Sequence, residues 1–480
     1  METDECGRND RVDLEVTLTE SKLQNCAIGP LLIKSTVVIE GNASLAALYG
    51  TEQNKASQNL AALYAPIIRL DENEPFRPLA AGYTIFHQDT DSPSFNRTIR
   101  LKSRKLKADQ VIEYAIWWDW DINHLYDLEH IWVYLDQDGR PVKVEGSWHG
   151  EVIDLATNGR LPLKETHPFV YAAPGKHAFA PDITHFQQRH AKVPELIARF
   201  VGAMGIVQNG LFKGHFHRSP PVDRLIHTYL HRSVFEPSWN YSRDFTFTEE
   251  MLVPWPALRQ WIPRRVKGLI QFLQQEITPE DYRTLRILRC TSIEDINQAA
   301  GLDVDMVTLD IGRNRWGFPA LSAAPGRPTG ANIVRLLQAC QKVRLGAYLV
   351  IQDGRTIPWL ARLLGREDWS DYLMTGASNP EWIIKIKAKV PQYRTVLIME
   401  TPPPDVVAAA QSTGASYIHV TSPSNSWLTP SWVNNIRQAE LGIVISAAGS
   451  SELPWVRSLG VEALVLDDPA LFEYPPSTNP

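Results

Sequence analysis

The alternation of hydrophobic and polar residues along this chain changes character near its middle. From Leu31 to about Phe247, short alternating runs are separated by Gly, Pro, Asn and Asp, a pattern typical of β-strands joined by turns. These runs predict strands at Leu31–Ile39, Tyr114–Trp120, Glu129–Leu135 and Phe169–Tyr171. Their spacing favours an antiparallel β-sandwich, with a helical segment around Val193–Met204 beside the sheets.

Beyond the boundary region, strand-like runs alternate with amphipathic runs of helix length, which is typical of β/α units around a parallel sheet. The predicted strands are Thr284–Leu288, Met306–Ile311, Gly346–Ile351, Tyr372–Thr375, Thr395–Met399, Tyr417–Val420, Ile443–Ser446 and Ala463–Leu466. The predicted helices are Ile293–Ala300, Ile333–Lys342, Asn379–Lys389, Asp405–Thr413, Ser431–Leu441 and Glu452–Leu459. This count suits a small α/β TIM barrel, with a doubly wound open sheet as the alternative.

The pattern divides the chain into four parts. Prolines at 254, 256 and 263 punctuate the boundary, and Val266–Glu276 follows them with helical spacing. We predict a disordered tail at 1–20, an all-β sandwich at 21–248, a Pro-punctuated linker and helix at 249–279, and a (β/α) barrel at 280–475. No glycine-rich phosphate loop occurs in the sequence, so a nucleotide-binding Rossmann or P-loop fold has no support.

Composition narrows the classes of partner. A chain of 480 residues is too long for one ordinary core, which agrees with two domains. The net charge of −6 argues against a general nucleic-acid binder, and no apolar run approaches the ~20 residues of a transmembrane segment. The polar, acidic start and four cysteines without Cys-x-x-Cys spacing predict a cytoplasmic protein with reduced thiols. The sequence leaves the oligomeric state open.

The densest chemistry lies in a predicted hairpin, with strand Glu113–Asp121, turn Ile122–Tyr126 and strand Asp127–Asp136. Side chains alternate along a strand, so Asp119 and Asp121 are expected on one face.

The second strand of this hairpin adds Asp127 and Glu129 on one face, and His124 comes from the turn. Several carboxylates close together repel one another unless a cation neutralises them, and oxygen ligands with one imidazole suit Mg²⁺, Mn²⁺ or Ca²⁺. The alternative is an exposed hairpin tip, because Asp, Asn and His also favour turns. Two further histidines, His149 and His177, are candidates to complete the site or to orient a ligand, or to be hydrogen-bonded inside the sandwich.

The run from Asn123 to Glu129 resembles the Gly-His-Arg-His-Asp-Trp-Glu motif of necrosis- and ethylene-inducing-peptide-like proteins and of the related vacuolar-sorting-type family. The likeness spans roughly residues 60–240. It implies a β-sandwich that holds a divalent cation at one edge. Carried over by position, the implied ligands are Asp121, His124, Asp127 and Glu129, with Asp119 as a close substitute. Four of the seven motif positions differ, and the chain lacks the export signal of the toxin members, so toxicity is not implied.

The segment Leu302–Pro469 resembles glycerophosphodiester phosphodiesterases, chiefly through its closing Leu466-Asp467-Asp468-Pro469. The family's active-site pattern is eroded: the His-Arg-Gly opening is absent, Thr308 stands in place of a metal-binding Glu, and only Asp310 remains. Two-histidine hydrolysis of a phosphodiester cannot proceed with these residues.

Active sites of such barrels lie where the strands end. The residues at those ends are Arg289, Asp310, Arg313, Gln352, Asp353, Glu400, His419 and Ser446. Among them Asp310, Arg313 and Glu400 are the candidate catalytic trio, although each is also a plausible member of a structural salt bridge.

Two functions follow from the sequence. The first is a metal-dependent hydrolase acting on a phosphodiester or a glyco- or phospholipid-derived small molecule, with His124 or His149 as acid/base. The alternative is a non-catalytic protein that binds a sugar or lipid head group through a structural cation and carries a pseudo-enzyme barrel. The absence of a nucleophile elbow or triad favours this alternative.

Overall fold

The computed structural model describes residues 52–103, 106–148, 150–189, 201–207, 210–212, 214–324, 327–343, 345–365, 373–424, 426–447 and 451–472. The tail predicted at 1–20, the strand Leu31–Ile39, most of the helix Val193–Met204, and His149 lie outside the described residues.

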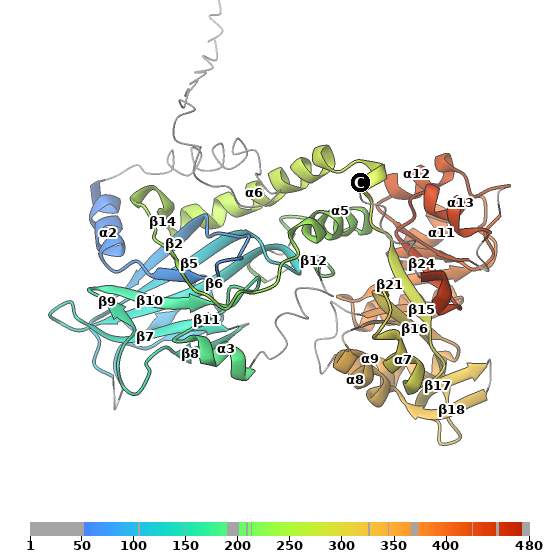
Figure 1. Ribbon diagram of the computed structural model, residues 1–480, viewed down its shortest axis with the longest axis horizontal. Coiled ribbons are helices and arrows are strands. Elements are labelled where there is room, and N and C mark those ends of the chain that lie inside the picture. Colours follow the sequence, from blue (N-terminus) through green and yellow to red (C-terminus); the bar gives the residue numbers. More distant parts are fainter. Residues whose placement is uncertain are drawn as a thin grey trace, which may run out of the picture.

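The described chain forms a β-rich N-terminal half followed by a closed parallel β/α barrel, so the predicted fold class is confirmed (Figure 1). Helices α5 (Pro220–Leu230) and α6 (Trp255–Glu276) connect the two halves along one side. None of the helices in the described part of the chain combines the length and hydrophobicity needed to cross a membrane.

Two sheets, mostly antiparallel, build the N-terminal half. The first contains β1 (Ile67–Leu70), β9 (Leu163–Lys164), β10 (His167–Ala172), β11 (Phe179–Ala180) and β13 (Arg243–Phe245). The second contains β2 (Ala80–Phe86), β5 (Gln110–Trp120), β6 (His124–Leu135), β7 (Pro141–Trp148), β8 (Glu151–Asp154), β12 (Gly205–Ile206) and β14 (Leu252–Pro254). Smaller elements are α2 (Glu52–Leu63), α3 (Ile183–Arg189) and the pair β3 (Thr90–Asp91) and β4 (Thr98–Ile99).

Both faces of the central strand β5 are buried, because layers cover it on either side. On one face Trp118 lies 6.0 Å from Phe179 of the first sheet, between ring centroids. On the other face Trp117 lies 6.2 Å from Trp261 of α6. Burial on both faces agrees with the apolar residues that occupy most positions of this strand.

Helix α6 is longer than the predicted Val266–Glu276, since it begins at Trp255 and includes Pro263. Pro256 lies in the first turn, where the missing N–H has no intrahelical partner to lose. The apolar side of α6 joins the N-terminal core through Leu258, Trp261, Ile262 and other side chains. The stabilisation from burying these side chains exceeds the cost of the backbone hydrogen bond that Pro263 cannot form inside the helix.

The barrel closes because β15 pairs with both β16 and β24, which excludes the open-sheet alternative. Its ring strands are β15 (Leu285–Arg289), β16 (Met306–Arg313), β19 (Gly346–Ile351), β20 (Leu373–Ala377), β21 (Arg394–Met399), β22 (Tyr417–Val420), β23 (Gly442–Ser446) and β24 (Ala463–Leu466). The helices around it are α7 (Ile293–Ala299), α8 (Ile333–Val343), α9 (Ile357–Leu364), α10 (Pro380–Lys389), α11 (Val406–Thr413), α12 (Pro430–Gln438) and α13 (Leu453–Ser458).

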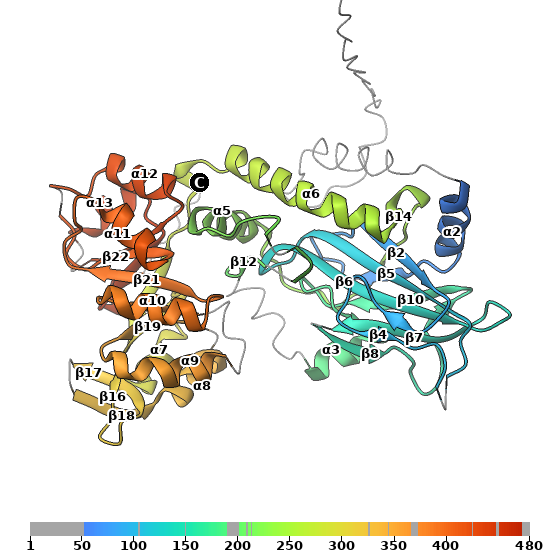
Figure 2. The same ribbon diagram turned by 180° about the vertical axis from the view of Figure 1, so that it is seen from behind.

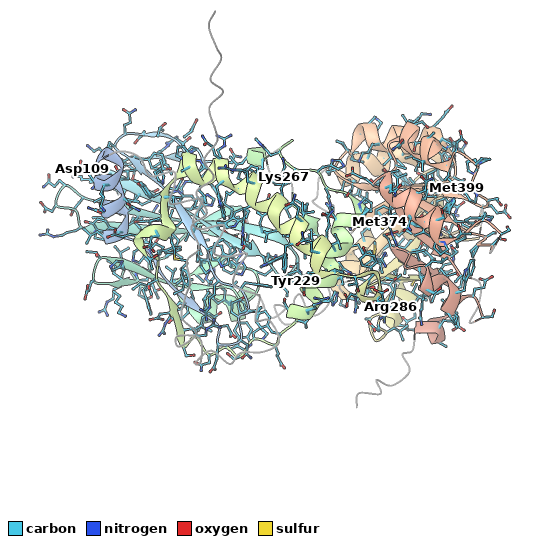
Figure 3. The ribbon with its side chains drawn as sticks, turned by 90° about the horizontal axis from the view of Figure 1, so that it is seen from above. Asp109, Tyr229, Lys267, Arg286, Met374 and Met399 are labelled. Carbon is cyan, nitrogen blue, oxygen red and sulfur yellow. The ribbon has the colours of Figure 1, made fainter. Side chains whose placement is uncertain are left out.

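Two features of the barrel were not predicted. Strands β17 (Pro319–Ala324) and β18 (Arg327–Asn332) form a hairpin that extends the sheet from β16 (Figure 2). Helix α9 follows β19 and carries Pro358 in its first turn, a position that favours proline. Seen from above, α6 runs from the β-rich half toward the barrel, and Tyr229 on α5 and Arg286 on β15 mark the junction between the halves (Figure 3).

Candidate functional site

The predicted hairpin exists, but its turn is tighter than expected. The backbones of Asp121 and His124 exchange two hydrogen bonds of 3.0 and 3.3 Å, which enclose Ile122 and Asn123 in a tight turn between β5 and β6. Tyr126 then adopts a left-handed φ of 57° at the start of β6. Such a conformation is uncommon for a bulky residue and marks a local departure from regular pairing immediately before Asp127.

The register of this hairpin corrects the prediction for Asp119. Trp118 pairs with Asp127 and Ile116 pairs with Glu129, so the two acidic side chains of β6 share a face with the even-numbered residues of β5. Asp119 therefore lies on the opposite face. The prediction that Asp119 and Asp121 lie together was wrong because Asp121 follows the end of the strand, where the alternation no longer applies.

Asp119 instead faces helix α6. Its carboxylate accepts a hydrogen bond of 3.0 Å from Arg265 Nε, and Arg265 Nη2 contacts its second oxygen. Trp117 Nε1 donates to the same carboxylate over 2.9 Å. The two charged side chains are 6% and 12% exposed, so this ion pair is a buried link between the sheet and the helix.

Asp121, Asp127 and His177 converge at the edge of the hairpin. One ligand atom from each lies within 4.8 Å of the others, and the three come from the end of β5, from β6 and from the loop between β10 and β11. His177 Nδ1 is 3.3 Å from Asp127 Oδ2. The cluster is buried except at Asp127, whose side chain is 15% exposed and opens the site to solvent.

The loop that supplies His177 is held in an unusual conformation. Gly175 has a φ of 66° and its N–H donates to Glu74 Oε2 over 2.6 Å. His177 itself has a φ of 58°, and its ring stacks on Trp118 with centroids 4.7 Å apart. A left-handed histidine persists when its surroundings fix it, and such residues gather at functional sites.

The charges around the cluster favour an additional cation. Lys176 Nζ lies 2.7 Å from Asp121 Oδ1, and His177 Nε2 is 3.8 Å from Glu74 Oε1. Burial would lower the pKa of His177, but its contacts with Asp127 and Glu74 raise that pKa to about 9. Burial also acts to raise the pKa of Asp121, whereas His124 and Lys176 lower it below its ordinary range. Three carboxylates, those of Glu74, Asp121 and Asp127, therefore surround His177. A divalent ion that displaced the His177 proton would replace the positive charge that these carboxylates now hold there.

Two potential ligand atoms in this cluster are also unsatisfied. Asp121 Oδ2 and His177 Nε2 are buried and have no hydrogen-bond partner among the described residues. Buried polar atoms are almost always paired, so an unpaired carboxylate oxygen and an unpaired imidazole nitrogen within one cluster call for a partner. Metal–oxygen distances of about 2.1 Å for Mg²⁺ to 2.6 Å for Ca²⁺ are compatible with ligand atoms at this spacing. The residues present thus fit a divalent cation.

The other predicted ligands have different contacts. His124 Nδ1 is 2.7 Å from the carbonyl oxygen of Tyr126, while its Nε2 is 3.5 Å from Asp121 Oδ1, beside the cluster. Glu129 Oε2 accepts a short hydrogen bond from Ser147 Oγ. Burial, followed by the charge of Asp127, raises the pKa of Glu129 well above its ordinary range, so this side chain keeps its proton at neutral pH.

Sequence reasoning did not assign Glu74 or Lys176 to the site. Both come from segments distant from the hairpin, and a lone Glu or Lys carries no spacing signal. Lys176 precedes His177, a candidate residue, and this adjacency was the one feature of the sequence that could have pointed to it.

The candidate trio of the barrel is not assembled by the described contacts. Asp310 accepts hydrogen bonds from Arg289 Nη1 at 3.0 Å and Gln352 Nε2 at 2.9 Å. Arg313 Nε is instead 3.1 Å from Asp353 Oδ2. Glu400 is exposed after β21, and β19 and β20 separate that strand from the strand of Asp310.

The histidine of the barrel strands is enclosed. His419 Nδ1 is 3.0 Å from the Tyr348 hydroxyl and its Nε2 is 2.8 Å from Ser446 Oγ. Burial lowers the pKa of His419 to about 3, so the ring is neutral. A neutral, doubly hydrogen-bonded histidine inside the barrel is not available as an acid to a substrate at the mouth.

Comparison with known proteins relates the barrel to solved structures. No family model and no curated protein matches the chain. Among solved structures, a phosphodiesterase from Oleispira antarctica in complex with the product sn-glycerol-3-phosphate is 13% identical, with a TM-score of 0.34, over 39% of this chain and 94% of that chain. A glycerophosphodiester phosphodiesterase from Agrobacterium tumefaciens is 16% identical, with a TM-score of 0.32, over 40% of this chain and 99% of that chain.

A third such enzyme, from Parabacteroides distasonis, is 8% identical with a TM-score of 0.34, over 39% of this chain and 95% of that chain. The C-terminal barrel thus resembles glycerophosphodiester phosphodiesterases at low identity. The strand order establishes the barrel independently of these likenesses, and a shared fold does not license a shared reaction.

Proposed function

We propose that the β-rich half holds a divalent cation, Mg²⁺, Mn²⁺ or Ca²⁺, at Asp121, Asp127 and His177, and that the protein uses this ion to bind an anionic head group of a small molecule or lipid. The observation that carries the proposal is the convergence of these three side chains with two unsatisfied ligand atoms. The partial exposure of Asp127 leaves a direction from which a ligand oxygen can complete the coordination.

Binding without hydrolysis is favoured over catalysis in the barrel. At the mouth of the barrel, Arg289 donates hydrogen bonds of 3.0 Å to Asp310 and 2.8 Å to Asp467. The carboxylate of Asp310, the one acidic residue that matches the phosphodiesterase pattern, is therefore already paired with a positive charge. His419, on barrel strand β22, is buried, hydrogen-bonded through both ring nitrogens and neutral. This arrangement supports a barrel that serves as a platform rather than as the reacting centre.

Hydrolysis at the N-terminal cluster is the second candidate, and one observation favours it. Glu129 lies on the same strand face as Asp127, and burial raises its pKa above the ordinary range of a carboxyl group. A carboxylic acid beside a bound cation is suited to protonate a leaving group while the ion polarises the bond.

Metal analysis and calorimetry test the cation site first. Purified protein is titrated with Mg²⁺, Mn²⁺ and Ca²⁺, beside Asp127→Asn and a matched control, Asp244→Asn, which alters an acidic residue paired with Arg69 on β13. We expect one ion bound by the wild type and by the control, and a loss of about tenfold or more in affinity in Asp127→Asn. Equal affinity in all three proteins, or no binding at all, refutes the cation site.

A ligand panel then separates the two functions. Phosphorylated sugar and lipid head groups, and phosphodiester and ester substrates, are offered with the cation and with a chelator. Cation-dependent binding without product supports recognition. Cation-dependent turnover that disappears in Glu129→Gln supports hydrolysis, and turnover that survives Asp127→Asn contradicts both assignments.

A further inference from the structure

A cavity lies at the junction of the two halves, at the end of the barrel opposite the mouth. Helix α5 bounds the cavity on one side. On the other side lie residues at or just before the amino ends of six ring strands, among which Leu285, Met306 and Tyr417 form an apolar wall. About 620 Å³ there is free of protein atoms, part of it open to solvent. Neither the sequence motifs nor the proposed cation site uses this cavity.

The carboxylates around this cavity already have partners. Glu462 Oε1 accepts from Arg437 Nε over 2.9 Å, and its Oε2 accepts from the Ile443 N–H over 2.8 Å. Asp223 Oδ2 accepts from Arg218 Nε over 2.9 Å and from Arg394 over 3.0 Å. The acidic side chains are therefore engaged within the protein and do not call for a cation.

In contrast, some of the hydrogen-bond donors around the cavity have no acceptor. Arg224 Nη2, Arg283 Nε and His227 Nδ1 are buried, and within the described part of the chain they have no hydrogen-bond partner. Arg224 is 5% exposed and His227 is 6% exposed, and all three residues line the cavity. A buried donor without an acceptor is destabilising, and more so when it is charged, so three of them at one cavity point to a ligand that supplies acceptors.

These donors are also held in place before any ligand arrives. The Arg224 guanidinium lies 4.1 Å from the centroid of the Tyr282 ring, and its Nη1 donates to Glu462 Oε1 over 3.2 Å. His227 Nε2 is 3.1 Å from His231 Nε2. Burial, and then the charges of His231 and Arg283, hold the pKa of His227 well below its ordinary value, so the ring is neutral and one nitrogen carries a proton. Donors that are preorganised in this way lose little entropy when an acceptor binds.

We propose that this cavity binds a small molecule that bears an oxyanion, a phosphate or a carboxylate, whose oxygens accept hydrogen bonds from Arg224, Arg283 and His227. Guanidinium groups match such anions in geometry and charge, and the apolar wall accommodates a small organic body. Because Arg224 and His227 belong to α5 while Arg283 precedes β15, the ligand joins the two halves and stabilises their docked arrangement.

Calorimetry on the full chain tests this site, with inorganic phosphate, a small phosphate monoester and the dicarboxylate succinate as probes. A chelator is present, so that an ion at Asp127 cannot recruit the anion. The variants are Arg224→Gln, which leaves Glu462 bonded to Arg437, and Arg283→Gln, whose acidic partners Asp303 and Asp305 keep their contacts with Arg286. Arg232→Gln is the matched control, because that arginine lies just after α5 in a surface pair with Glu276.

We expect at least one probe to bind the wild type and Arg232→Gln alike, and about tenfold or more weaker binding in Arg224→Gln and Arg283→Gln. Which probe binds best distinguishes a phosphate ligand from a carboxylate one. Absence of binding by every probe at millimolar concentration overturns the proposal, as does equal affinity in Arg283→Gln and the control. Asp127→Asn is expected to bind the anion normally, so failure of the cation site and failure of this one are told apart.

Discussion

The buried pair between Asp119 and Arg265 provides the sharpest test of how the hairpin faces are assigned. Arg265→Met removes the charge and keeps much of the aliphatic stem that packs on the sheet. Removing one member of a buried ion pair costs about 3–5 kcal/mol because the other charge is left without its partner. Trp117 Nε1 still donates to Asp119 over 2.9 Å, so we expect a loss of about 3 kcal/mol in the free energy of unfolding.

Urea unfolding of the wild type, Arg265→Met, Asp119→Leu and the double variant measures this loss and the coupling between the two side chains. Each single variant should be destabilised, and the double variant should recover part of the loss, since two apolar side chains replace two charges. Cation affinity is measured on the same proteins and should not change, in contrast to Asp127→Asn. Wild-type stability in Arg265→Met, or a loss of cation binding in Asp119→Leu equal to that in Asp127→Asn, would refute the assignment of Asp119 to a structural role.

Two further predictions concern the barrel and the loop that carries His177. Burial lowers the pKa of His419 from 6.5 to about 3, so its contribution to stability is present above pH 6.5 and is lost as the pH falls toward 3, by as much as about 5 kcal/mol. His419→Asn should flatten the acid side of the stability profile measured by urea unfolding, and an unchanged profile contradicts this. Gly175→Ala should lower the free energy of unfolding by about 1–3 kcal/mol and weaken cation binding, because φ is 66° and the added Cβ would lie 3.1 Å from Ile122. The matched variant Gly159→Ala has a similar φ of 73° with no atom within 4 Å, and it should cost only the backbone strain and leave cation binding unchanged when both are titrated by calorimetry.

The barrel strands were predictable because a parallel strand buried on both sides must be apolar along its whole length. Segments such as Gly346–Ile351 and Tyr417–Val420 were predicted with the bounds that the structure has. The hairpin β17–β18 escaped prediction because it extends from the ring as an added pair, and Gly326 and Pro328 within Pro319–Asn332 read as a loop.

Within the candidate site, local sequence determined what lies on the hairpin. Asp121, Asp127 and Glu129 belong to one contiguous run. Residues on either side of a tight turn lie close together because the turn itself pairs the two strands. The prediction for Asp119 failed because Asp119 keeps the alternation of β5, whereas Asp121 lies beyond the end of that strand and turns to the other face.

Tertiary structure alone decided which residues complete each site. Glu74 precedes the hairpin in the sequence and His177 follows it, and the two meet there only in the folded structure. Arg224 contacts Arg283 because α5 docks against the barrel. None of these residues has a spacing that reveals its partner, since contacts between distant segments are set by how whole sheets and helices pack. The sequence by itself determined the two architectures and the acidic hairpin, while packing determined the charge balance and the unsatisfied atoms on which both proposed sites depend.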